Sequence, residues 1–256
     1  MIWDVVAARL SARAPVIVYT MGKVGTTSYR HSLKKLRRHP VFAIHHINAE
    51  YRKELVLGGA NVIQEPSAVR KLRSWLLHRL LIRSGRPYLL VTGVRDPVAQ
   101  ILSRFHHTSN KFWPDAAPSV DELARWFLDN VDLNFPLDWF DRELLPVTGI
   151  DVYAVPFDRA RGWTILERGA TRCLVLKLES SDAAKEEGLR TLLGVREFRL
   201  ESFNVTEDKL SADRYLAFKD AMRLPRDVMD RLLASRYVRH FYTSAEAEQI
   251  RRRWQA

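Results

Sequence analysis

The feature that most constrains the fold is a short apolar run that stops abruptly at a glycine-bearing loop. Residues 16–19 read VIVY between a proline and the loop, which predicts a buried strand. Apolar residues then recur at helical spacing to about Arg38, and Thr26 or Thr27 is suited to cap that helix. A strand, a tight loop and a helix N-terminus in this order present unpaired backbone N–H groups, which is typical of a phosphate site.

The loop itself carries the residues that such a site needs. Gly22 and Gly25 let the backbone approach an anion closely and adopt positive φ where required. Lys23 adds a mobile positive charge. Further donors come from the hydroxyl groups that follow, those of Thr26, Thr27 and Ser28.

The rest of the chain alternates apolar strands with helices, which predicts an α/β fold with a P-loop-like, mainly parallel sheet flanked by helices on both faces. Further strands are expected at 41–46 and 88–94, and within 150–157 and 171–179. From residue 181 onward the pattern is mostly helical. We therefore expect one domain over residues 1–256, with a nucleotide-binding core at about 14–180 and a helical C-terminal part at about 181–256. Helices are expected at 67–85, 97–107, 119–129, 137–145, 183–193, 207–222, 226–235 and the C-terminus.

Composition narrows the cellular setting and the kind of partner. No apolar run in the 256 residues approaches the roughly 20 residues of a membrane span, and the N-terminus lacks the pattern of a secretory signal. One cysteine, Cys173, excludes an internal disulfide, so we expect a cytoplasmic protein with this thiol buried. The net charge of +11 calls for an acidic partner. Because the basic residues are dispersed, we do not expect that partner to be nucleic acid.

The order of residues in the loop separates two phosphate-binding families. The nucleoside-triphosphate P-loop, G-x-x-x-x-G-K-[ST], fails here because Lys23 precedes the second glycine instead of following it. The order Lys23-Val24-Gly25-Thr26-Thr27 resembles instead the 5′-phosphosulfate loop of sulfotransferases, K-x-G-[ST]-[ST] after an aromatic-ended strand. That resemblance implies 3′-phosphoadenosine 5′-phosphosulfate (PAPS) as the donor and 3′-phosphoadenosine 5′-phosphate as the product.

A second match lies at the distance that the resemblance demands. Sulfotransferases hold the 3′-phosphate with an arginine that ends a later strand and a serine eight residues on. Arg95 and Ser103 stand at that spacing in YLLVTGVRDPVAQILSRF. Both can converge on one anion because the long arginine side chain can reach back along the following helix.

Among sulfotransferase-like proteins, the chain looks most like a bacterial capsular polysaccharide synthesis family. The segments that carry this likeness are MGKVGTTS, the helix that begins at RDP, and FYTSAE near the C-terminus. It covers the first ~110 residues well and the remainder loosely, and implies a carbohydrate acceptor. The R-K-G-x-x-G segment of cytosolic small-molecule sulfotransferases is absent, since Arg168-Gly169-Ala170 continues without a second glycine.

The resemblance assigns roles to the loop residues. Lys23 would stabilise charge on the departing bridging oxygen, while Gly22, Val24, Gly25, Thr26, Thr27 and Ser28 would cradle the 5′-phosphate and sulfonate. No metal is required, and no metal-ligand motif occurs in the sequence.

The residue that accepts the proton of the acceptor hydroxyl or amine stays open at this point. His45 and His46 follow the second predicted strand, and alternation lets only one of them face the site, with a preference for His46. The alternatives are Glu65, His106 and His107. Lys209, in the first turn of a later helix, is a further candidate for contacting the donor.

Three other functions are open from sequence alone. These are an ATP-dependent P-loop kinase-like phosphotransferase, a polyanion-binding protein without catalysis, and a sulfotransferase-like protein that binds the nucleotide without turnover.

Overall fold

The computed structural model describes residues 2–52, 67–109, 119–201 and 209–256 of the chain. Its contacts group into two compact units. Of the described residues, the first, the sheet unit, comprises 2–52, 67–95 and 139–201. The second, the helical unit, comprises 96–109, 119–138 and 209–256. The expectation of a single domain stays a prediction, and each unit is described below by itself.

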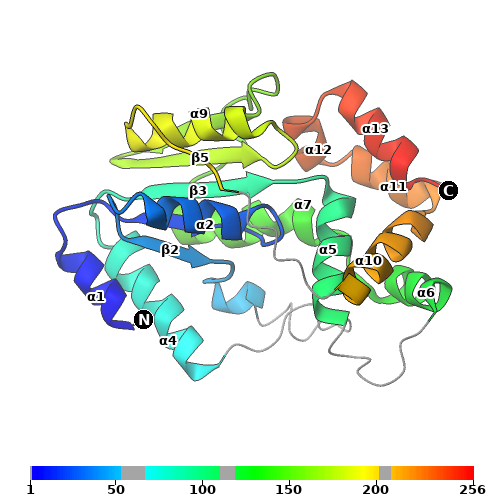
Figure 1. The fold of residues 1–256 in the computed structure, drawn as a ribbon, viewed down its shortest axis with the longest axis horizontal. Helices are drawn as coiled ribbons and strands as arrows, with labels where there is room; N and C mark the ends of the chain where they lie inside the picture. The colour runs from blue at the N-terminus through cyan, green and yellow to red at the C-terminus, as the bar shows by residue number, and fades with distance from the viewer. Residues whose placement is uncertain (1, 53–66, 110–118, 202–208) are drawn as a thin grey trace. The chain divides into compact units, whose positions relative to one another are not determined.

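A five-stranded sheet forms the centre of the sheet unit (Figure 1). Its order is β2-β1-β3-β5-β4, with neighbouring pairs parallel except β4 with β5, which is antiparallel. The α/β class and the mainly parallel sheet are therefore confirmed. The carboxyl ends of four strands meet at one edge, which places the loop after β1 beside the ends of β2 and β3. The strands are β1 (Val16–Tyr19), β2 (Val41–Ile44), β3 (Leu89–Val94), β4 (Trp163–Arg168) and β5 (Thr171–Lys177).

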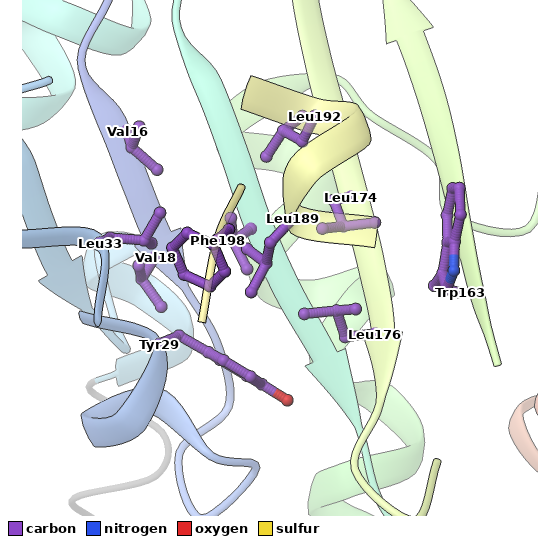
Figure 2. Close-up of a cluster of buried hydrophobic side chains, with 11 residues drawn as sticks. Val16, Val18, Tyr29, Leu33, Trp163, Leu174, Leu176, Leu189, Leu192 and Phe198 are labelled. Carbon is purple, nitrogen blue, oxygen red and sulfur yellow. The ribbon is translucent and has the colours of Figure 1, made fainter. Parts of the chain in front are cut away.

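Helices α2 (Thr26–Lys35) and α9 (Asp182–Leu193) cover one face of this sheet. Figure 2 shows their apolar side chains directed onto strand residues whose side chains alternate toward that face. The resulting core consists of Val16, Val18, Tyr29, Leu33, Val91, Trp163, Leu174, Leu176, Leu189, Leu192 and Phe198. Burial of this whole set fixes the register of the strands, because a one-residue slip would turn their side chains to the other face.

The opposite face of the sheet packs on the segment that follows residue 138. Tyr19 of β1 meets the Trp139 ring edge to face, with centroids 5.4 Å apart. Trp139 and Phe140 are both buried, and Cys173 of β5 is buried as expected. The remaining elements of the sheet unit include α1 (Ile2–Leu10), α4 (Ala68–Leu77), the π-helical turns η1 (His78–Ile82) and η2 (Phe140–Leu144), and α8 (Leu145–Thr148).

The helical unit is built around buried aromatic side chains. Phe105 of α5 packs against Phe127 of α6 and Phe218 of α10, with ring centroids 5.2 and 5.6 Å away. Trp254 donates its indole N–H to Asp96 at 2.7 Å, which ties the C-terminal helix to the start of α5. The helices are α5 (Pro97–Ser109), α6 (Val120–Asn130), α10 (Lys209–Ala221), α11 (Arg226–Leu233), α12 (Arg236–Phe241) and α13 (Ser244–Trp254); α7 (Phe135–Trp139) follows α6 in the chain.

Most expected elements are present, and the differences have local causes. Residues 150–157 hold no strand, because the Asp151 carboxylate accepts from the backbone N–H of Tyr153 and so folds the chain into a turn. The next strand in the chain is β4, which pairs with β5. The two strands are joined by a two-residue connection that begins at Gly169, whose φ is 55°. The strand expected at 41–46 ends at Ile44. Within the described ranges, no helix is long and apolar enough to cross a membrane.

Candidate functional site: the loop between β1 and α2

Three residues of the loop between β1 and α2 have left-handed backbone geometry. Gly22, Lys23 and Gly25 have φ values of 83°, 58° and 86°. Glycine adopts this geometry without penalty, but a lysine does so rarely. The conformation of Lys23 is therefore held by its surroundings, and residues so held cluster at ligand sites.

The N-terminus of α2 has no side-chain cap. Gly25 is the capping residue, so the expectation that Thr26 or Thr27 fills this role is wrong. The first turn of α2 also contains no acidic residue. The positive end of the helix dipole thus faces the loop without a carboxylate in its own first turn, an arrangement that favours an anion.

Gly25 leaves no space for a side chain. A Cβ at this position would stand 3.1 Å from the Tyr29 hydroxyl and 3.1 Å from Leu178 Cδ1. The Tyr29 hydroxyl is buried and, within the described residues, has no hydrogen-bond partner. Burial is the main cause that raises the pKa of Tyr29, so the hydroxyl stays protonated beneath the loop.

Thr20, which the sequence analysis did not single out, links the strand end to the rest of the site. Its hydroxyl lies 2.7 Å from the Thr26 hydroxyl, 3.2 Å from His45 Nδ1 and 3.3 Å from the backbone N of Gly22. The Thr26 hydroxyl is thus engaged inside the loop, while Thr27 is exposed. The signal in the sequence is a threonine that directly ends an apolar strand before a glycine loop.

The His45 ring, rather than that of His46, packs against the loop. A Cβ on Gly22 would lie 3.8 Å from both Cε1 and Nδ1 of His45. His45 Nδ1 is 2.8 Å from the carbonyl oxygen of Thr20, which can only accept a hydrogen bond. We therefore assign the proton of the neutral ring to Nδ1, which leaves the lone pair on Nε2.

Arg95 reaches the same loop from the end of β3. Its guanidinium donates from Nη1 to the Lys23 carbonyl oxygen at 2.9 Å. Val24 packs near Gly93 of the same strand, where an added Cβ would be 3.2 Å from Val24 Cγ2. The structure thus brings Lys23, Gly25, His45 and Arg95 together at the carboxyl edge of the sheet.

A buried carboxylate, Glu143, organises the turn after β2. Its side chain is fully buried, and Oε1 accepts from the Tyr19 hydroxyl and from the backbone N–H groups of Ile47 and Asn48, the last at 2.9 Å. Glu143 Oε2 lies 3.8 Å from His46 Nδ1. Burial, with the nearby Glu143 charge second, raises the pKa of Tyr19 well above its usual range, so this hydroxyl remains a donor.

Glu143 was missed because only the fold shows its importance. A glutamate inside the segment LDWFDRELLP looks like a solvated helix residue. The available signal is that the residues three and four positions away on either side are apolar, which favours a buried and hydrogen-bonded role over an exposed one.

The other candidates from the sequence belong to the helical unit or fall outside the described residues. Ser103 is half-buried on α5, and Lys209 is the first residue of α10, both in the helical unit. His106 is buried in that unit and its ring stacks on Tyr215 at 4.6 Å, while His107 is exposed. Glu65 lies outside the described residues. The roles of Ser103 and Lys209 stay predictions.

The fold defines an α/β protein whose first strand, glycine loop and helix have the geometry that suits an anion. A protein-family model described as "Putative capsular polysaccharide synthesis protein" (NKWYS) matches residues 115–243. This match spans just over half of the chain, so the chain belongs to that family. The matched range begins after the loop, whereas the sequence resemblance was expected to be stronger over the first ~110 residues. No curated protein and no solved structure matches the chain.

Proposed function

We propose that this protein is a sulfotransferase that transfers a sulfuryl group from PAPS to a hydroxyl group of a carbohydrate. The observation that carries the proposal is the uncapped N-terminus of α2 behind the left-handed Gly22-Lys23 pair, with His45 beside it. This cradle suits the negatively charged 5′ end of PAPS, because the loop carries a lysine and leads to backbone N–H groups in a helical turn without an acidic residue. Membership in a capsular polysaccharide synthesis family supports a carbohydrate acceptor.

The residues of the loop would take distinct roles. Bound PAPS supplies an activated sulfuryl group and leaves as 3′-phosphoadenosine 5′-phosphate. Lys23 would stabilise negative charge as it develops, and the backbone N–H groups at the start of α2 would hold the 5′-phosphate. Arg95, which bonds the Lys23 carbonyl, would fix the shape of the loop and contribute charge to donor binding.

His45 is the residue that we assign as general base. The hydrogen bond from Nδ1 to the Thr20 carbonyl orients the ring and leaves Nε2 to take the proton from the acceptor hydroxyl. His46 lies near the buried Glu143 carboxylate instead, so its place in the fold favours a supporting role.

Turnover with a set of acidic and neutral polysaccharides tests this proposal. We would measure the release of 3′-phosphoadenosine 5′-phosphate from PAPS with wild-type protein, Lys23→Ala and Lys34→Ala. Removing a group that stabilises charge in the transition state lowers kcat by about a hundredfold or more, which we expect of Lys23→Ala. Lys34→Ala is the matched control, since Lys34 is exposed on α2, the helix that follows the loop, and should keep full activity. Retained turnover in Lys23→Ala would exclude Lys23 from the mechanism.

A further inference from the structure

A small cavity lies at the amino edge of the sheet, the edge opposite the β1–α2 loop. It is formed where β3 and β5 begin and where the connection from β4 to β5 passes. Its volume is about 170 Å³, well above the roughly 10–15 Å³ that one water needs. All of its lining residues belong to the sheet unit, so it is a site within one compact body.

Two arginines line this cavity, and no acidic residue does. Arg168 donates from Nη1 to the Thr148 carbonyl oxygen at 2.6 Å. Arg86 donates to the carbonyl oxygens of Arg9 and Ser11, the latter at 2.6 Å. In the described part of the chain neither guanidinium forms an ion pair. Backbone carbonyls thus fix both side chains without neutralising their charge.

The backbone makes room for one of these guanidinium groups. A Cβ on Gly149 would stand only 2.1 Å from Arg168 Nη1. Gly149, with φ 69°, is the left-handed residue that ends α8, and no other residue type would leave this space. The position of the Arg168 guanidinium therefore depends on a specific local geometry.

Hydroxyl groups complete the polar lining of the cavity. Tyr88 and Thr171 contribute them, and Tyr88 is 4% exposed. The Thr148 hydroxyl is already used, because it donates to the Leu144 carbonyl oxygen at 2.8 Å. Burial raises the pKa of Tyr88 to about 12, so its hydroxyl remains protonated at neutral pH and can donate. Two guanidinium groups beside these two hydroxyls match the hydrogen-bonding pattern of a tetrahedral oxyanion.

We propose that this cavity, the Arg86–Arg168 pocket, binds a phosphate or sulfate ion. Each guanidinium has five N–H groups, and the hydrogen bonds to backbone carbonyls of other residues do not use all of them. The remaining N–H groups can donate to the oxygen atoms of the ion. The pocket is separate from the loop that carries the proposed transfer chemistry, and does not depend on that function.

Nuclear magnetic resonance of the arginine side chains tests the pocket directly. Protein labelled with ¹⁵N-arginine would be titrated with sodium phosphate, and separately with sodium sulfate, at constant ionic strength. The Nε–Hε signals of Arg86 and Arg168 are assigned from Arg86→Gln and Arg168→Gln. We expect both signals to shift and to saturate at the same anion concentration, in wild type and in Lys23→Ala. The signal of Arg196, an exposed arginine whose side chain forms no hydrogen bond or ion pair within the described residues, is the control and should not shift in this way.

Two substitutions of Arg168 test whether its guanidinium binds the ion. Hydrogen bonds to charged groups are strong, so Arg168→Gln should weaken binding, read from the Arg86 signal, by about tenfold or more. Arg168→Lys keeps the charge but lacks the planar guanidinium that can donate to the Thr148 carbonyl and to the ion at the same time. It should weaken binding less than Arg168→Gln does. Signals that never saturate, or that move in parallel with Arg196, would show charge screening only and would overturn the proposal. Saturation that is lost in Lys23→Ala would also overturn it, because the ion would then bind at the loop.

Discussion

His45 and His46 are neighbours in the chain, yet their side chains face different surroundings. The first packs against Gly22 of the loop, and the second lies near the buried Glu143 carboxylate. Alternation along the strand predicted that only one of them would face the site. Alternation alone does not say which, so the preference for His46 had no contact to support it. The structure favours His45 as the residue that meets the acceptor.

Substitution of each histidine by glutamine separates the two. Glutamine at position 45 can still donate to the Thr20 carbonyl but cannot take a proton at neutral pH. Loss of a general base lowers kcat by about 10²–10⁴-fold, so we expect a loss of this size for His45→Gln and a much smaller one for His46→Gln. Steady-state kinetics with saturating PAPS measures both. Equal losses, or a larger loss for His46→Gln, would return the role to His46.

Gly25 is the residue whose replacement should most clearly damage the loop. Alanine there would combine a left-handed φ with contacts of 3.0–3.1 Å to Tyr29 and Leu178. Gly194, with φ 62° and nothing within 4 Å, is the matched control for backbone strain alone. Strain of this kind costs about 1–2 kcal/mol. Chemical denaturation should therefore show a larger loss of the free energy of unfolding for Gly25→Ala than for Gly194→Ala, and equal losses would mean that the crowding is relieved without cost.

At the scale of elements, the turn after β2 depends on a carboxylate from a distant segment. Glu143 comes from the π-helical turn η2 and bonds the backbone of residues 47 and 48, just beyond the two histidines. The Tyr19 hydroxyl of β1 donates to the same oxygen. One side chain thus joins the ends of two neighbouring strands where the loop begins.

Two substitutions at Glu143 distinguish its hydrogen bonds from its charge. Glu143→Ala removes the acceptor of three donors, and each buried group left unpaired costs about 1–3 kcal/mol. We therefore expect a loss of several kcal/mol in the free energy of unfolding. Glu143→Gln keeps an acceptor oxygen of the same shape and should cost less. Urea denaturation compares them, and equal losses would contradict an acceptor role.

The strand–loop–helix could be predicted from sequence because its signals are local. An apolar run, two glycines and helical spacing all lie within residues 16–36. The contacts of Thr20 and Glu143 could not be predicted, because they depend on which distant segments the fold brings beside them. The strand within 150–157 was wrong for a related reason, since the side chain of Asp151 competes locally for the backbone.

At the scale of the whole molecule, the parallel strand order explains why separate segments supply one site. Loops after β1, β2 and β3 meet at one edge of the sheet, so Lys23, His45 and Arg95 converge although they are far apart in sequence. Ser103 and Lys209 belong to the helical unit, and their part in donor binding remains a prediction from spacing. The net charge of +11 attracts any anion, so binding experiments must hold ionic strength constant.

A PAPS-dependent transfer requires that the protein bind a 3′-phosphorylated adenine nucleotide. Isothermal titration calorimetry with 3′-phosphoadenosine 5′-phosphate measures this binding, with ATP–Mg²⁺ and 5′-AMP as comparison ligands at the same ionic strength. We expect 3′-phosphoadenosine 5′-phosphate to bind more tightly than either, and Arg95→Ala to weaken its binding. Tighter binding of ATP–Mg²⁺, or no preference for the 3′-phosphate over 5′-AMP, would contradict it.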